Sequence, residues 1–136
     1  MRAFLIVGVV LLGLGFGPAG AQDAEADIQA VISGQIEAFK ADDFETAFSF
    51  ASPTIKRMFG SPARFGAMVQ TGYPMVWRPA QVRFSVVQTR GGRTIQSVVV
   101  TDQSGALYVL DYEMIAVDGG WQIDGVTVRR TGDADA

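Results

Sequence analysis

The hydrophobic period changes once along this chain, near Tyr73-Pro74, and that change predicts its architecture. Before this point apolar residues recur three and four positions apart, which is typical of amphipathic helices. After it they alternate with polar residues, which is typical of half-buried strands. Helices followed by strands favour an α+β domain, in which N-terminal helices pack on a curved, antiparallel four-stranded meander.

The helical half carries its own start and stop signals. An apolar stripe from Ile28 to Phe39 predicts a first helix over about residues 27–41, and Asp42-Asp43 ends it and caps a short second helix. Two further short helices are each opened by a Ser-Pro pair and closed by a glycine that accepts the left-handed conformation. These signals are Ser52-Pro53 with Gly60, and Ser61-Pro62 with Gly72.

Turn signals divide the second half into four strands. The predicted strands begin near Gln81, Thr94, Ala106 and Trp121. In the last strand Trp121 and Ile123 share one parity, whereas Val126 and Val128 share the other. An extra residue near Asp124-Gly125 turns all four inward, so we expect a β-bulge there.

Residues 1–21 are typical of a cleavable export signal. Arg2 precedes an apolar run of fourteen residues, and small residues lead to a cleavage site after Ala21. The run is shorter than the roughly 20 apolar residues that span a bilayer, so we expect no membrane segment after cleavage. This predicts a periplasmic or secreted protein with one domain over residues 22–130 and a disordered tail over residues 131–136.

Missing residue types exclude several chemistries. The chain has no cysteine and no histidine, so we expect no disulfide, no zinc-type metal site, no histidine-dependent triad and no cofactor. After cleavage, ten bases and fourteen acids give a net charge of −4, which argues against nucleic acid as a partner. The cluster Asp42-Asp43-x-Glu45 lacks the spacing of a calcium loop and is interpreted as a helix cap.

Several segments together resemble a known family. They are Gln35–Phe44, Ala47–Pro53, Met58-Phe59-Gly60, Gly72-Tyr73-Pro74, Tyr112-Glu113-Met114 and Trp121–Val126. The chain resembles the uncharacterised bacterial family of small exported proteins called domain of unknown function 4864. Its order of elements is also similar to the wider nuclear-transport-factor-2-like (SnoaL-like) superfamily. That resemblance implies a cone fold with a pocket between sheet and helices, in which some members are enzymes and many only bind ligands or partners, so it assigns no activity.

Four aromatic residues are the first candidate site. Tyr108 and Tyr112 fall on the inward face of the third strand, and Tyr73 and Trp77 precede the sheet. A cone-type enzyme would pair a tyrosine hydroxyl with a buried carboxylate, but both acids of that strand fall on its outward face. We therefore predict ligand-binding roles for the four, with catalysis by Tyr108 or Tyr112 as the weaker alternative.

Basic residues gather in the middle of the chain. Residues 46–101 contain seven bases and no acid. A positive face formed there would suit an anionic ligand, with Arg57 and Arg64 as candidate contacts. The alternative is internal pairing, in which Arg83 and Arg93 lie on strands beside the acid-bearing third strand.

Three functions stay open. The first is a non-catalytic protein that binds a small molecule or a protein partner at the helix–sheet seam or the basic segment; a phenylalanine cluster from Phe39 to Phe65 would line an apolar pocket if loosely packed. The second is a cofactor-free acid/base enzyme, isomerase- or dehydratase-like. The third is an assembly protein that forms a homodimer through outward apolar residues of the third strand, Leu107, Val109, Ile115 and Val117.

Overall fold

The computed structural model describes residues 19–131, with side chains from Asp23 onward. The predicted export signal lies almost entirely outside this range, and so does the predicted tail beyond Thr131. Thr131 itself donates its backbone N–H to the carbonyl of Leu107 (3.3 Å). Across the described residues, no helix combines the length and apolarity needed to cross a bilayer.

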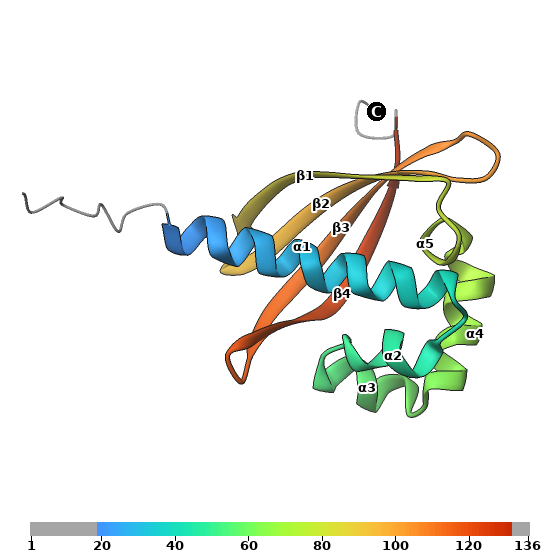
Figure 1. Cartoon of the computed structure of the whole chain (residues 1–136), viewed down its shortest axis with the longest axis horizontal. Coiled ribbons are helices and arrows are strands. Elements are labelled where there is room, and N and C mark those ends of the chain that lie inside the picture. Colours follow the sequence, from blue (N-terminus) through green and yellow to red (C-terminus); the bar gives the residue numbers. More distant parts are fainter. Residues whose placement is uncertain (1–18, 132–136) are drawn as a thin grey trace, which may run out of the picture.

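Within residues 19–131, the helices precede an open antiparallel sheet (Figure 1). The helices are α1 (Ala19–Lys40), α2 (Phe44–Ser49), α3 (Pro53–Phe59), α4 (Pro62–Gly72) and α5 (Pro74–Trp77). The strands are β1 (Gln81–Arg90), β2 (Arg93–Thr101), β3 (Leu107–Val117) and β4 (Gly120–Arg130). They follow one another in the order β1-β2-β3-β4, each antiparallel to the next. The predicted α+β class with a four-stranded meander is therefore confirmed.

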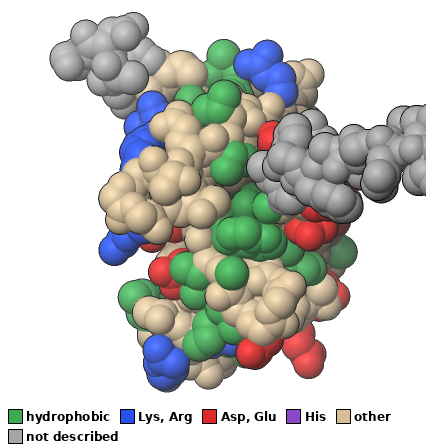
Figure 2. All heavy atoms as spheres, turned by 90° about the vertical axis from the view of Figure 1, so that its left-hand side faces the viewer, with side chains coloured by type: hydrophobic (Ala, Val, Ile, Leu, Met, Phe, Trp, Pro, Cys, Tyr) green, Lys and Arg blue, Asp and Glu red, His purple; other side chains and the backbone are tan. Residues whose placement is uncertain are grey.

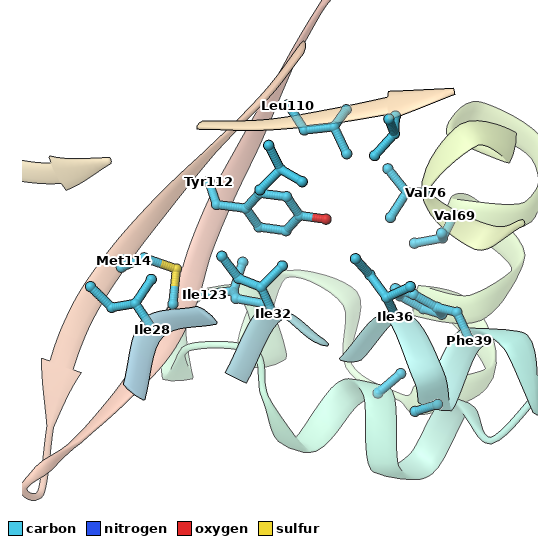
Figure 3. Packing of buried hydrophobic residues seen from close by; sticks show 14 of the residues in the cluster. Ile28, Ile32, Ile36, Phe39, Val69, Val76, Leu110, Tyr112, Met114 and Ile123 are labelled. Carbon is cyan, nitrogen blue, oxygen red and sulfur yellow. The ribbon is translucent and has the colours of Figure 1, made fainter. Parts of the chain in front are cut away.

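Helix α1 lies across one face of the sheet and buries its apolar stripe there (Figure 1). Ile28 lies beside Met114 and Ile32 beside Tyr112, while Ile36 points toward α4 and α5 (Figure 3). Each of these side chains contributes roughly 1.5–3 kcal/mol when fully buried. The helix starts well before the predicted residue 27, because its alanine-rich first turns have high helix propensity but no apolar stripe that reveals them.

The predicted helix caps are confirmed at four of five positions. Asp43, Ser52 and Ser61 accept hydrogen bonds from backbone N–H groups three residues on, and Gly60 ends α3 with a φ of 79°. The expectation for Gly72 is wrong: it is the last helical residue of α4, and Tyr73 is the cap, with a φ of −137°. Because Tyr73 precedes Pro74, the α conformation is disfavoured there, and the chain breaks at Tyr73 before starting α5.

Two bulges bend the sheet, one of them predicted. Glu113 pairs with Gly125 and Met114 with Ile123, so Asp124 is the extra residue in β4, as expected. The second bulge, opposite Ser97 in β1, was not predicted. There the Nε2 of the buried Gln96 donates to the carbonyls of Ser85 (3.0 Å) and Val86 (3.3 Å).

A short segment between α2 and α3 closes part of the β4 edge. Ala51 forms an isolated parallel bridge with Ile123; the N–H of Ser52 donates to the Ile123 carbonyl (2.8 Å), and the N–H of Ile123 donates to the carbonyl of Phe50 (2.9 Å). The Ser52 hydroxyl also donates to Asp124 Oδ1 (2.7 Å). This bridge fixes where α3 stands relative to the sheet.

Candidate ligand-binding cavity

A cavity of about 360 Å³ lies where α1, α3 and α4 meet the middle of β4. Its wall is contributed by those elements, by α5 and by the segment that bridges to β4. The lining residues are Gln35, Phe39, Ala51, Ile55, Met58, Phe59, Phe65, Met68, Val69, Tyr73, Val76, Ile123, Gly125 and Val126. The volume falls within the range of small-molecule sites, about 300–1,000 Å³.

The phenylalanine cluster forms one wall of this cavity. Phe65 lies at its centre, with ring centroids 5.8 Å from Phe39, 5.3 Å from Phe48 and 5.6 Å from Phe59. These are ordinary packing distances for aromatic pairs, so the rings form a solid seam between the helices.

Helix α3 lines a second side of the cavity. None of its residues is fully buried, although Ile55 and Phe59 pack partly against the core. The β4 bridge anchors the start of α3, and the serine cap fixes its direction. The helix therefore packs only partly against the core, and its residues Ile55 and Met58 line the cavity beside it.

The polar content of the cavity is small. Of the lining residues, Gln35 and Tyr73 are those with polar side-chain atoms, and none is charged. Gln35 is 3% exposed and its Nε2 donates to the carbonyl of Ala47 (3.1 Å), which ties α1 to α2. Among residues 19–131, no donor is found on the Gln35 amide oxygen.

Two methionines lie on the helices that flank the cavity. Met58 on α3 is 68% exposed, and Met68 on α4 is half-buried. Methionine is unbranched and polarisable, so it adapts to ligands of different outline. An exposed methionine beside an apolar cavity is the kind of surface that such a ligand would cover.

Of the predicted aromatic site residues, Tyr73 lines the cavity. Trp77 lies outside the lining and donates from Nε1 to Asp42 Oδ1 (3.0 Å). The guanidinium of Arg78 stacks 4.2 Å from the Trp77 ring and pairs with the same carboxylate (2.9 Å). These contacts join the α1–α2 turn to the end of α5.

Tyr112 is wholly buried and its hydroxyl has no hydrogen-bond partner within the described residues. Burial raises the pKa of Tyr112 above its ordinary value. In Figure 3 the hydroxyl points away from β3 toward Val76 and Val69, two residues that line the cavity. Tyr108 also faces inward but is half-buried, with the Arg130 guanidinium 5.8 Å from its ring.

The carboxylates of β3 lie on the outward face, as the alternation predicts. Asp111 is buried there between Arg129, whose Nε donates to it at 2.9 Å, and Ser97, whose hydroxyl donates at 2.8 Å. Burial by itself raises the pKa of Asp111, but the hydrogen bonds from Arg129 and Ser97 outweigh it and hold the pKa below its usual range. The sheet therefore separates this acid from the tyrosines.

The bases show a mixture of pairing and exposure. Arg93 pairs with Glu113 (2.7 Å), as the internal-pairing alternative predicts. The placement of Arg83 beside the third strand is wrong, because β1 is an edge strand and β2 separates it from β3. Arg57 and Arg64 are exposed and lie outside the cavity lining. Figure 2 shows the charges on one face, with most basic side chains toward its left and top margins and most acidic ones toward its lower right.

The acidic cluster after α1 acts in capping and turn formation. The side chain of Thr46 and its backbone N–H, which donates to Asp43 Oδ1 (3.1 Å), together lower the pKa of Asp43. Asp42 adopts a φ of 54°, and its Oδ1 accepts hydrogen bonds from the side chains of Trp77 and Arg78. Across the described residues, no three acidic side chains come close enough together to hold a metal ion.

Several lining residues were not predicted, above all Gln35, Met58 and Val126. One signal pointed to Gln35: it stands on the apolar stripe of α1, next to Ile36, where a polar residue is out of place. No pattern singled out Met58 or Val126, because their shared wall exists only once α3 is placed against β4.

Among known proteins, one family model matches this chain. No curated protein and no solved structure matched the chain, so the wider nuclear-transport-factor-2-like resemblance stays a prediction. A family model described as Domain of unknown function (DUF4864) matches residues 21–136, which include every residue after the predicted export signal. This protein therefore belongs to the DUF4864 family.

Proposed function

We propose that this protein binds a small, predominantly apolar molecule in the cavity between α1, α3, α4 and β4. The observation that carries the proposal is the composition of a wall of fourteen residues, in which two side chains are polar and none is charged. Small-molecule sites are typically concave and apolar with a few placed polar groups. At about 30 Å³ for each water-sized unit, the cavity suits a molecule of about a dozen non-hydrogen atoms.

Binding is better supported than acid/base catalysis. The enzyme alternative needs a carboxylate within hydrogen-bonding reach of Tyr108 or Tyr112. Asp111 lies on the other face of the sheet and is engaged by Arg129 and Ser97, and the cavity lining contains no acid. The residues that line the cavity can hold a molecule but include no carboxylate that could act as the general base.

Binding is also better supported than a homodimer through the sheet. Leu107 is 46% exposed on the outward face, but the middle of that face is occupied by the Asp111–Arg129 ion pair. Charged residues are depleted at the centre of protein interfaces. A second copy would have to cover this polar centre.

Export forms a separate part of the proposal. It rests on the pattern of residues 1–21. Cleavage after Ala21 would remove the first three residues of α1 and keep its apolar stripe, which begins at Ile28. Mass spectrometry of the protein from its own cell envelope would find a mature chain starting at Gln22; a full-length mass would contradict export by cleavage.

Naphthalene is a suitable uncharged probe for the cavity. In methyl-detected NMR we expect saturable shifts at Ile55, Met58 and Val126, because these side chains line the space. Val126→Phe should weaken binding by about tenfold or more, since its ring occupies the cavity. Val128→Phe is the matched control: Val128 is half-buried on the same strand and packs against the core, but lies outside the lining. No saturable shift, or equal weakening by both variants, would overturn the proposal.

A further inference from the structure

We infer that Gln35 selects an uncharged ligand carrying one hydrogen-bond donor, a hydroxyl or N–H group, which it accepts at its amide oxygen. The inference rests on the proposed function, since it names the chemical class that the same cavity takes. It begins from the one deeply buried polar side chain in the wall.

The orientation of the Gln35 amide follows from its neighbour. The carbonyl oxygen of Ala47 can only accept a hydrogen bond, so it must meet the NH₂ group of the amide (3.1 Å). Turning the amide over would bring two oxygens together. The contact therefore leaves the acceptor Oε1 as the remaining polar end of the side chain.

That acceptor is matched to a ligand donor. Gln35 lines the cavity, and within residues 19–131 no donor is found on its Oε1. This oxygen is not among the buried side-chain atoms that lack a hydrogen-bond partner, so it keeps access to the cavity, where a donor on the ligand can replace water as its partner. Tyr73, the other polar residue of the wall, is half-buried, so Gln35 is the deeper of the two recognition groups.

The absence of charged side chains from the cavity lining favours an uncharged ligand. None of the lining side chains is charged. The nearby Arg78 is already engaged by Asp42 and by the carbonyl of Phe39. A carboxylate or ammonium entering this space would lose its hydration without gaining a counter-ion, which strongly disfavours it.

Three probes that share one ring system test the inference. They are 2-naphthol, which has a donor; 2-methoxynaphthalene, which keeps the oxygen but lacks the donor; and 2-naphthoate, which is charged. By calorimetric or NMR titration at pH 7, 2-naphthol should bind between about twofold and tenfold more tightly than the methyl ether. We expect 2-naphthoate to bind at least about tenfold more weakly than 2-naphthol.

Gln35→Met removes the acceptor and keeps the length of the side chain. The variant should bind 2-naphthol and 2-methoxynaphthalene equally. Gln29→Met is the control, because Gln29 lies on the same helix and pairs with Glu25 away from the cavity wall; it should leave the ratio unchanged. Loss of the Ala47 contact lowers the stability of Gln35→Met, so its folding is checked by thermal unfolding.

The outcomes separate the two proposals. If the naphthol and its methyl ether bind the wild-type protein equally, or if 2-naphthoate binds best, the inference is wrong while the binding function stands. If none of the probes binds, the proposed function itself fails. The wild-type comparison decides the matter even where Gln35→Met does not fold.

Discussion

Removing one oxygen atom from the core should make this protein more stable. Tyr112 is fully buried between β3 and α1, and its hydroxyl lacks a hydrogen-bond partner among the described residues. In the unfolded chain the same hydroxyl is hydrated. Tyr112→Phe keeps the ring and its packing and removes the group that loses its water on folding.

The magnitude follows from the cost of an unpaired buried polar group, about 1–3 kcal/mol. The small cavity left by the missing oxygen offsets part of the gain in stability, so we expect the free energy of unfolding to rise by about 1 kcal/mol. For a domain of this size that corresponds to an increase in Tm of about 4 °C. Urea denaturation and thermal unfolding followed by circular dichroism measure both quantities.

Stability measured at alkaline pH tests whether the buried Tyr112 hydroxyl is the cause of the effect. Burial raises the pKa of Tyr112, so above about pH 10 the unfolded chain releases a proton that the folded chain retains. Stability is therefore full below pH 10 and falls as the pH rises beyond it. Tyr112→Phe should lose less stability over that range than the wild type.

The control is Tyr108→Phe, because Tyr108 is half-buried and keeps access to water; its effect should stay within about 0.5 kcal/mol. Destabilisation by Tyr112→Phe of more than about 0.5 kcal/mol would refute the reasoning. It would mean that the hydroxyl donates to an internal water or another partner, and that its loss breaks a hydrogen bond.

Three further substitutions test the packing and polar contacts. Gly66→Ala should destabilise the protein by about 1–3 kcal/mol in urea titrations, because the added Cβ would lie 2.5 Å from the ring of Phe44. The control is Gly72→Ala on the same helix, whose Cβ meets no atom and which should be neutral or stabilising by a few tenths to about 1 kcal/mol. Equal effects of the two substitutions would contradict this account. Ser52→Ala should cost about 2 kcal/mol, because one hydroxyl both caps α3 and donates to the β4 bulge; a loss below about 0.5 kcal/mol would show that these bonds contribute little. Asp111→Asn should cost about 1 kcal/mol at pH 7, discounted because Arg129 is 39% exposed. Since the pKa of Asp111 is lowered, its contribution is present above about pH 4 and lost as the pH falls, so the variant should show a smaller loss of stability between pH 7 and pH 3.

The parts of the fold that sequence predicted are those set by local rules. The Asp43, Ser52 and Ser61 caps follow from side chains that bond neighbouring N–H groups, and the Asp124 bulge follows from strand parity. The bulge in β1 was not predicted, because it involves the side chain of Gln96, which belongs to the next strand. Long-range contacts of this kind leave no pattern in the segment that they bend.

The candidate site divides in the same way. Strand parity correctly predicted that Tyr112 faces inward. It could not show that α1 covers this residue completely, or that the cavity lies nearer α3 and α4. The phenylalanine cluster located one wall. The opposite wall requires the placement of α3, which is determined by a bridge between Ala51 and Ile123, more than seventy positions apart in the chain.

Both margins of the sheet are interrupted, and this bears on how the protein behaves when crowded. On β4 the segment around Ala51 already occupies the backbone of Ile123, and on β1 the carbonyls of Ser85 and Val86 are taken by Gln96. Exposed strand margins with regular, free backbone groups recruit strands from other molecules and start aggregates. Here an incoming strand would meet a broken ladder on either side. The two bulged margins thus favour a chain that stays dispersed at high concentration.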